Sequence, residues 1–350
     1  MIRRELEEKV RVAEPIQKMD LRGLDLEGAV FDGGIFEEVD FSGAELAGLS
    51  AKEASFISCD FTGAKLGGAK LRNATIFRTD LSGADLREVD LVSATLNEGA
   101  AQGASFAGAD LTLTSFVGVD LRQAVFVQAT LDRTTYLQGS TVGVNFAGTH
   151  LDRVVLVEAD LRQADLRGVR GTAAIFVKAN LSGQNLAGAD LAKCQFMEAD
   201  LRGVDLSGAK LGQAGFKGAD LRGANLDGAQ ASQCLFVEAN MAQVSAKRAT
   251  LTQAIFVDAN LAEAQFVGAD ARQIIAHRAS LQGAQLVGAD LREADFSYAN
   301  LTGASFMQTK LLRTEFHAAI EDDAVFGPGR ALARGVDEAL VEAERWQPPY

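Results

Sequence analysis

The sequence predicts an all-β solenoid in which four five-residue repeats form each coil. A central position recurs at every fifth residue from Leu21 to Phe316, which gives 60 repeats without insertion or deletion. In 52 repeats this central residue is Leu, Phe, Ile, Met or Tyr, and in 55 the residue two places earlier is small. The pattern fits neither the period of a helix nor that of a flat strand. The backbone must therefore return to one orientation every five residues.

The phenylalanines predict how many repeats make a coil. Eighteen of the 20 Phe residues occupy repeat centres, and ten of these share one position in a 20-residue period, where chance would put about a quarter. Residues 20 apart are thus expected to stack, so that 60 repeats make about 15 coils. We number the four sides of the coil by their first centres, which are Leu21, Leu26, Phe31 and Phe36. Stacking of neighbouring coils buries these centres.

Several repeats also carry a family resemblance. Residues 84–87 (ADLR), 219–226 (ADLRGANL) and 289–292 (ADLR) resemble the A(D/N)LXX signature of the pentapeptide repeat family. The resemblance covers residues 20–316 and implies a right-handed quadrilateral β-helix. It also implies three roles that family members have. Some imitate duplex DNA and occupy the DNA-binding saddle of type II topoisomerases such as gyrase, some dimerise, and some accompany bacterial secretion systems or their effectors.

The ends of the repeat array need caps, because an open solenoid end exposes unpaired backbone and apolar centres. We expect residues 1–18 to form an N-terminal cap segment with a short charged helix, and residues 19–318 to form the β-helix. Residues 319–350 are predicted to form a loop and an amphipathic helix over 330–346. This helix is either a C-terminal cap or a dimer contact. Its apolar face contains Leu332, Val336, Leu340 and Ala343.

Composition narrows the location and the partners. The formal net charge of -13 repels nucleic acid and anionic membranes. No 18-residue apolar run predicts a membrane span, and the charged N-terminus lacks the apolar core of a signal peptide. Cys59, Cys194 and Cys234 are too few and too scattered for a disulfide framework or a zinc site. We therefore expect a cytoplasmic, bacterial protein with a protein partner, and no direct contact with nucleic acid or membrane.

The sequence offers no constellation for catalysis. His150, His277 and His317 occupy positions predicted to point outward on different coils, so no catalytic, metal or cofactor site is expected and the chain is not predicted to be an enzyme.

Two departures from the repeat concern the packing of the core. Ile274 lies between two consecutive alanine centres and is expected to refill their volume. Residues 134–144 are interpreted as drift in the repeat rather than a hinge or a ligand gap.

One column of acidic residues marks the first side. It resembles a line of phosphates, but arginines follow two residues after several of its members, and net charge is far below that of a DNA duplex of the same length. Hydrogen bonding at the turns is the simpler interpretation, and DNA mimicry is the alternative. The column consists of Asp20, Asp40, Asp60, Asp80, Asp120, Asp160, Asp200 and Asp220.

The fourth side carries apolar residues at positions expected to face water. Directly after its centres, nine of 15 residues are large and apolar, and further apolar residues precede the centres. A monomer rarely exposes so continuous an apolar surface. Either the β-branched residues simply favour an extended backbone, or this side binds a partner protein or a second copy of the chain side by side. The residues predicted to bind are Val117, Leu137, Val155, Val157, Ile175, Val177, Met197, Leu235, Val237, Ile255, Val257 and Ile275.

These observations lead to a ranked prediction of function. The first hypothesis is a non-catalytic interaction scaffold or adaptor that uses the apolar residues of the fourth side. The second is a DNA-mimicking modulator of gyrase that acts through the acidic first side. A role beside a secretion system rests on the family resemblance alone.

Overall fold

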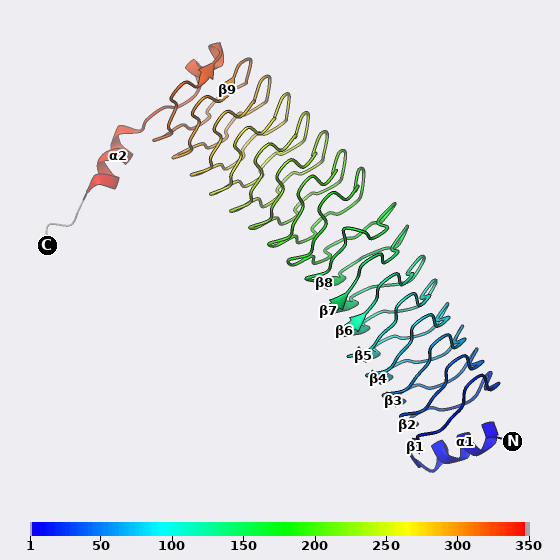
Figure 1. Cartoon of the computed structure of the whole chain (residues 1–350). Helices are drawn as coiled ribbons and strands as arrows, with labels where there is room; N and C mark the ends of the chain where they lie inside the picture. The colour runs from blue at the N-terminus through cyan, green and yellow to red at the C-terminus, as the bar shows by residue number, and fades with distance from the viewer. Residues whose placement is uncertain (1, 347–350) are drawn as a thin grey trace. The chain divides into compact units, whose positions relative to one another are not determined.

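A computed structural model describes residues 2–346, which divide into two compact units that meet in sequence at Asn180 and Leu181. Both units are parallel β-helices with four-sided coils of 20 residues (Figure 1). The predicted fold class, a right-handed quadrilateral β-helix with a helix at each terminus, is confirmed. Right-handed winding is the rule for connections between parallel strands.

In the first unit, one side of the coils forms an eight-stranded parallel sheet whose strands follow one another in chain order. Figure 1 shows these strands one above another along a single side. Residues pair with partners 20 positions away, as Phe36 does with Phe56. The strands are β1 (Ile16–Gln17), β2 (Ile35–Glu37), β3 (Ser55–Ile57), β4 (Thr75–Phe77), β5 (Thr95–Asn97), β6 (Ser115–Asp120), β7 (Thr135–Ser140) and β8 (Val155–Val157).

In the second unit, most coils are joined by single parallel bridges between residues 20 apart. A two-stranded parallel sheet forms near its end from β9 (Ser305–Phe306) and β10 (Val325–Phe326). Phe326 stacks on Phe306 with ring centroids 4.9 Å apart, so the coil geometry continues through β10.

The predicted stacking of residues 20 apart is confirmed in the cores of both units. The rings of Phe36 and Phe56 lie 5.0 Å apart in the first unit. Phe216 and Phe236 lie 4.9 Å apart in the second. Most of the small residues two places before the centres are buried as well, and most of these are alanines. The large central side chains and the small side chains two places before them therefore both point into the core, which is the arrangement that the repeat predicts.

The N-terminal helix α1 (Ile2–Arg11) covers the first coil. Leu6 is fully buried, and the Arg3 guanidinium donates hydrogen bonds to the carbonyl oxygens of Glu27 (2.7 Å) and Gly28 (2.6 Å). The Glu7 carboxylate accepts a hydrogen bond from the Val30 amide at 3.1 Å. The helix thus satisfies backbone groups that would be unpaired at an open end.

The C-terminal segment differs from the single helix expected over 330–346. A 3₁₀ helix, η1 (Pro328–Leu332), is followed by an extended stretch and then by helix α2 (Glu338–Arg345). The extended stretch forms because Arg334 pairs with the last coil, donating to the Thr314 carbonyl at 2.8 Å and accepting from the Phe316 amide at 3.1 Å. Asp337 then caps α2 by accepting from the Leu340 amide at 3.1 Å. Leu332 and Val336 consequently lie outside α2.

Arg330 of η1 closes the end of the core. Its guanidinium carbon lies 4.8 Å from the ring centroid of Phe316 and 5.2 Å from that of Phe326, and its Nη2 bonds Glu321 at 3.0 Å. A guanidinium over an aromatic face is attracted by the ring quadrupole. Leu332, Val336 and Leu340 remain 61, 56 and 43% exposed, and Ala343 is exposed too.

Candidate interaction surfaces

The fourth side of the first unit carries a row of outward apolar residues on the sheet β6–β8. We call Val117, Leu137, Val155, Val157, Ile175 and Val177 the N-terminal row. Its members are neighbours in register, since Val117 pairs with Leu137, and Leu137 pairs with Val157. Val155 is bridged to Ile175 in the next coil. The structure therefore brings these predicted residues together on one surface.

The second unit carries its own row on the fourth side. The C-terminal row consists of Met197, Leu235, Val237, Ile255, Val257 and Ile275. Its most exposed members are Met197, Leu235 and Ile275, at 43, 42 and 38%. Bridges join Leu235 to Ile255 and Ile255 to Ile275. Met197 is set apart, because the next coil holds Gly215 and Lys217 at the corresponding positions. The continuous part of this row spans three coils, from Leu235 to Ile275.

Both rows are less exposed than single outward residues would be. Every member of the N-terminal row is half-buried, as are Val237, Ile255 and Val257 of the C-terminal row. Side chains 20 residues apart cover one another because the coils stack at a strand spacing of about 4.8 Å. The rows are thus packed apolar ridges rather than isolated exposed side chains.

Leu113 is an apolar surface residue that the repeat pattern did not single out. It is 46% exposed and holds φ at 61°, two places after a centre, where nearly all other repeats have Gly or polar residues. It lies two residues before β6, beside the N-terminal row. Most non-glycine residues at this turn position share the left-handed conformation, from Glu38 to Arg313, so the φ value of Leu113 belongs to the coil and only its exposed apolar side chain is unusual. Its signal was present in the sequence as a large apolar residue at a turn position.

An amide ladder borders the C-terminal row. The Nε2 atoms of Gln213, Gln233 and Gln253 each donate to the Oε1 atom of the glutamine one coil onward, at 2.9, 2.9 and 3.1 Å. Gln273 ends the ladder by donating to the Glu293 carboxylate at 2.8 Å. The other border holds Glu238, whose carboxylate is 56% exposed and lies 3.8 Å from Lys217. Asp258 on the same border is held by Arg278 at 2.7 Å.

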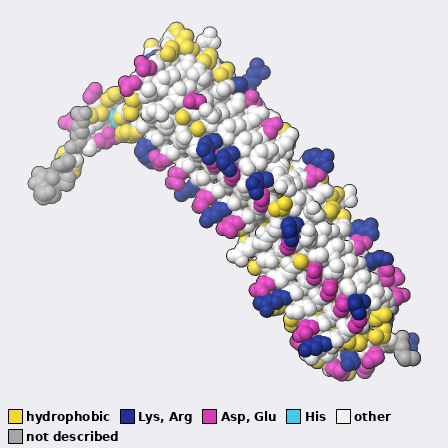
Figure 2. Space-filling model, in the orientation of Figure 1, with side chains coloured by type: hydrophobic (Ala, Val, Ile, Leu, Met, Phe, Trp, Pro, Cys, Tyr) yellow, Lys and Arg dark blue, Asp and Glu magenta, His cyan; other side chains and the backbone are white. Residues whose placement is uncertain are grey.

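The acidic column of the first side is engaged in turns and ion pairs. Asp200 accepts from the Arg202 backbone amide at 3.2 Å, and its carboxylate binds that guanidinium at 2.8 and 2.6 Å. Asp20, Asp120, Asp160 and Asp220 bind the arginine two residues onward in the same way. Figure 2 shows basic side chains lying against acidic ones on the visible face. These pairs cancel much of the charge that DNA mimicry requires.

The remaining members of the column, Asp40, Asp60 and Asp80, accept hydrogen bonds from the backbone amides two residues onward, at 2.9, 2.8 and 2.8 Å. The parallel bridges connect Asp20 through Asp80 in sequence, then pass to Ala100. The column is therefore interrupted in the first unit. In the second unit it consists of Asp200 and Asp220, which are bridged to each other.

Asparagines take over the same turn position after Asp220. Asn260 and Asn300 accept from the amides two residues onward, each at 3.1 Å, as the aspartates do. An uncharged side chain thus accepts the same hydrogen bond from the backbone amide of the turn, and this bond does not require a negative charge. This supports hydrogen bonding at turns as the reason for the column.

The ion pairs also lower the pKa values of the paired aspartates in the column. The hydrogen bond from Arg22 lowers the pKa of Asp20 from its ordinary value of 3.8 to about 2. Hydrogen bonds from the paired guanidinium groups likewise lower the pKa of Asp120, Asp160, Asp200 and Asp220. These carboxylates are therefore ionised and paired at neutral pH, which excludes them as proton donors there.

The histidines are dispersed, but His317 is not outward as predicted. It is only 4% exposed, because the chain returns over it. Its Nδ1 accepts from the Asp337 amide at 3.2 Å, its ring packs edge-on against Tyr298, and its Nε2 faces the Glu344 carboxylate at 3.5 Å. Glu344 also bonds the Tyr298 hydroxyl. His317 thus anchors α2 to the last coils.

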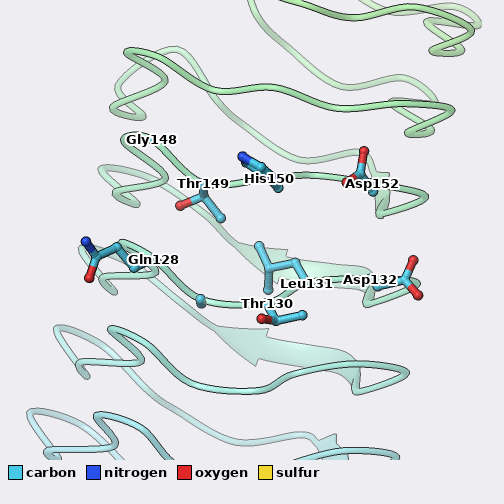
Figure 3. Close-up of a pocket in the computed structure, with 9 residues that line it drawn as sticks. Gln128, Thr130, Leu131, Asp132, Gly148, Thr149, His150 and Asp152 are labelled. Atoms are coloured by element: carbon cyan, nitrogen blue, oxygen red, sulfur yellow. The ribbon is translucent and has the colours of Figure 1, made fainter.

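A polar groove of about 310 Å³ lies on the first unit between two successive coils (Figure 3). Asp132 and Asp152 lie at one end, and Gln128 and Gly148 at the other. The Asp132 carboxylate is held by Arg153 at 2.6 Å and Arg133 at 3.2 Å. The Asp152 carboxylate accepts from the Thr172 amide at 2.9 Å. Both carboxylates therefore stabilise neighbouring coils.

Nothing in the described part of the chain assembles a metal site, since no group of three or more His, Cys, Asp or Glu side chains lies together there. The three cysteines are buried and unbridged. Burial raises the pKa of the Cys59 thiol to about 11 and that of Cys234 to about 12, so both are inert thiols at neutral pH. Within residues 2–346, no helix is long and apolar enough to cross a membrane.

The fold and its surfaces define a β-helical repeat protein. A family model described as pentapeptide repeats (8 copies) matches most of its length, and the chain belongs to the pentapeptide repeat family. The matched segments are residues 17–48, 54–92, 90–128, 102–135, 142–170, 174–213, 199–236, 214–253, 234–273 and 277–311. A search of curated proteins returned no match.

Solved structures give weaker similarities. QnrB1, a plasmid-mediated fluoroquinolone resistance protein, is 20% identical, with 60% of this chain and 92% of that chain covered and a TM-score of 0.25. HetL of Nostoc sp. strain PCC 7120, involved in heterocyst differentiation regulation, is 23% identical over 79 and 87% of the two chains, with a TM-score of 0.17. The mannuronan C-5 epimerase AlgE6 A-module of Azotobacter vinelandii is 10% identical over 96 and 93%, with a TM-score of 0.23. Scores this low carry no argument for function.

Proposed function

We propose that this protein is a non-catalytic scaffold or adaptor that binds a protein partner through the apolar rows of the fourth side. The observation that supports this most is the placement of the rows on the outward surface of the coils, where solvent favours polar side chains. The C-terminal row adds three residues more than one third exposed. Apolar burial is the main driving force for protein association.

The form of the surface favours a macromolecular partner over a small ligand. Small-molecule sites are concave and enclose most of the ligand, whereas the rows are ridges built from stacked side chains. We place this role in the cytoplasm, because buried cysteines that form no disulfide suit a reducing compartment. We also propose that two copies associate through the exposed Leu332, Val336, Leu340 and Ala343.

Replacing Val177, Val237 and Val257 with Lys is expected to abolish association through the rows without unfolding the β-helix. The three side chains point outward, so the lysine ammonium groups reach water in the free protein but would be buried in a complex. Partner recovery in a pull-down and mass by light scattering provide the readout. Circular dichroism verifies the fold. An unchanged mass together with an unchanged set of partners would contradict the proposal.

The alternative is a modulator of gyrase that presents its acidic column as a DNA mimic. The pairing of Asp20, Asp120, Asp160, Asp200 and Asp220 with arginine weakens this alternative, and only Asp40, Asp60 and Asp80 form an acidic run without an arginine of their own repeat. We expect micromolar protein neither to inhibit nor to protect purified gyrase in a supercoiling assay. Inhibition that disappears in an Asp40→Asn, Asp60→Asn, Asp80→Asn variant would establish the alternative instead.

A further inference from the structure

The backbone of the Leu235, Ile255 and Ile275 column is engaged in pairing between coils. The Leu235 and Ile255 amides donate to the carbonyls of Ala214 and Cys234, each at 2.9 Å. The Ile255 and Ile275 carbonyls accept from Phe236 and Phe256 at 2.7 and 2.6 Å. An extended peptide binds a sheet by pairing with free backbone groups at an edge. The Leu235 to Ile275 column offers no such edge, so we expect a partner whose own backbone groups are already hydrogen-bonded.

The dimensions of the row select an α-helix among such partners. Its continuous part, from Leu235 to Ile275, spans three coils about 4.8 Å apart, and its two columns are separated by roughly 7 Å. This area is far below the roughly 800 Å² that each partner contributes to a standard stable interface, so it is too small for the sheet of a second copy. It matches one helix about 10 Å wide.

The spacing of the coils also suits a helix that lies along the stack. One helical turn rises about 5.4 Å, close to the spacing of about 4.8 Å between coils. Over three coils, the helical rise per turn and the spacing between coils differ by only about 1 Å in total. Apolar residues at i, i+3 or i+4, and i+7 of a helix would therefore meet Leu235, Ile255 and Ile275 in turn.

The borders of the row indicate the charge of the helix. On one border, the Glu238 side chain is 56% exposed and only loosely paired, at 3.8 Å from Lys217. The charge of Asp258 on the same border is instead matched by Arg278 at 2.7 Å. On the other, the amide ladder is neutral until it ends at Glu293. The protein as a whole carries a net charge of -13. Complementary charge steers association and selects partners, so basic residues belong on the edge of the helix that faces Glu238.

We infer that the C-terminal row binds a basic amphipathic α-helix of a partner protein, laid along the coil stack from Leu235 to Ile275. This inference rests on the proposed function and names the kind of partner that the row accepts. The polar edges of that helix contact Glu238 on one side and the amide ladder on the other.

Site-specific photocrosslinking of the full-length protein in its native cell tests the inference. One variant carries a benzophenone amino acid in place of Ile275, and the control carries it in place of Val267, which is equally exposed at 38% but lies on the second side. A third variant replaces Leu235. Peptide mapping by mass spectrometry identifies the crosslinked segment, and thermal melts verify that each variant folds.

We expect Ile275 and Leu235 to crosslink to one segment of a partner whose apolar residues repeat at i, i+3 or i+4, and i+7. That segment should contain more Lys and Arg than Asp and Glu, and the Val267 variant should not capture it. Crosslinks to an extended or acidic segment, or to a second copy of this chain, would overturn the inference of a basic helical partner, and so would equal capture from Val267. Association through the row is tested separately by the lysine variant. If neither row position crosslinks to any protein, both the helix and the proposed function fail.

Discussion

Truncation of Ile274 to Ala is expected to lower the free energy of unfolding by about 2–5 kcal/mol, as large-to-small changes in a packed core do. Ile274 is 6% exposed and sits where nearly all other repeats have a small residue. It fills the space left by Ala271 and Ala276, so that a cavity of only about 10 Å³ remains between the surrounding Leu and Phe side chains. Removal of its outer carbons would open a dry void, because no polar group lines that space.

Urea denaturation followed by circular dichroism measures the change, and hydrogen exchange of peptides over residues 251–296 locates it. Ile275→Ala is the matched control, since the neighbouring isoleucine is 38% exposed and its truncation should have a much smaller effect. Adding Ala271→Leu to Ile274→Ala restores the usual pattern of the repeat and should recover part of the stability. Equal losses at Ile274 and Ile275 would show that Ile274 does not refill the core.

Substitution of Gly139 by Ala is the second change with a large expected effect, a loss of about 2–5 kcal/mol from backbone strain and overpacking together. Gly139 holds φ at 120°, a conformation that L residues rarely adopt. An added Cβ would also collide with the Val119 carbonyl oxygen and lie 2.7 Å from the Tyr136 hydroxyl. Tyr136 fills the core of this coil and donates a hydrogen bond to the same carbonyl at 3.4 Å. Gly139 therefore makes room for a tyrosine at a position that usually holds Leu or Phe.

The control for Gly139 is Gly67→Ala, in the same unit. A Cβ at Gly67 would have one neighbour, at 3.9 Å, and its backbone is not left-handed, so we expect a change within about 0.5 kcal/mol. Combining Gly139→Ala with Tyr136→Phe removes the hydroxyl contact but leaves the collision with Val119, and should restore stability only in part. Thermal melting of these three variants and of the wild-type protein provides the comparison. A Gly139→Ala variant as stable as the Gly67→Ala variant would refute the steric account.

The coil architecture could be predicted from the sequence because the repeat is a local rule. The five-residue spacing of the centres and the 20-residue spacing of Phe36, Phe56 and their successors translate directly into stacked rings. The refilling by Ile274 could also be predicted, since it depends only on volumes within one coil. Residues 134–144 departed from the repeat in the sequence, but the pairing of Gly139 with Tyr136 became visible only when both were placed in space.

The features that the sequence did not predict depend on contacts between distant segments. His317 was expected outward, and it is buried because residues 337–344 return over it. The helix expected over 330–346 is interrupted because Arg334 pairs with the last coil, an interaction that outweighs helical periodicity. Outward apolar residues could be assigned to the fourth side, but their half-burial follows from the closeness of the coils above and below.

The central claim is that the apolar rows of the fourth side, rather than apolar surface residues in general, bind the partner. Quantitative pull-down with two matched double variants tests it most directly. One replaces Val237 and Val257 with Lys in the C-terminal row, and the other replaces Val267 and Val287 with Lys on the second side of the same unit. We predict that the row variant loses the partners that wild-type protein recovers, while the second-side variant retains them. Equal recovery by both variants, or loss in both, would contradict the claim.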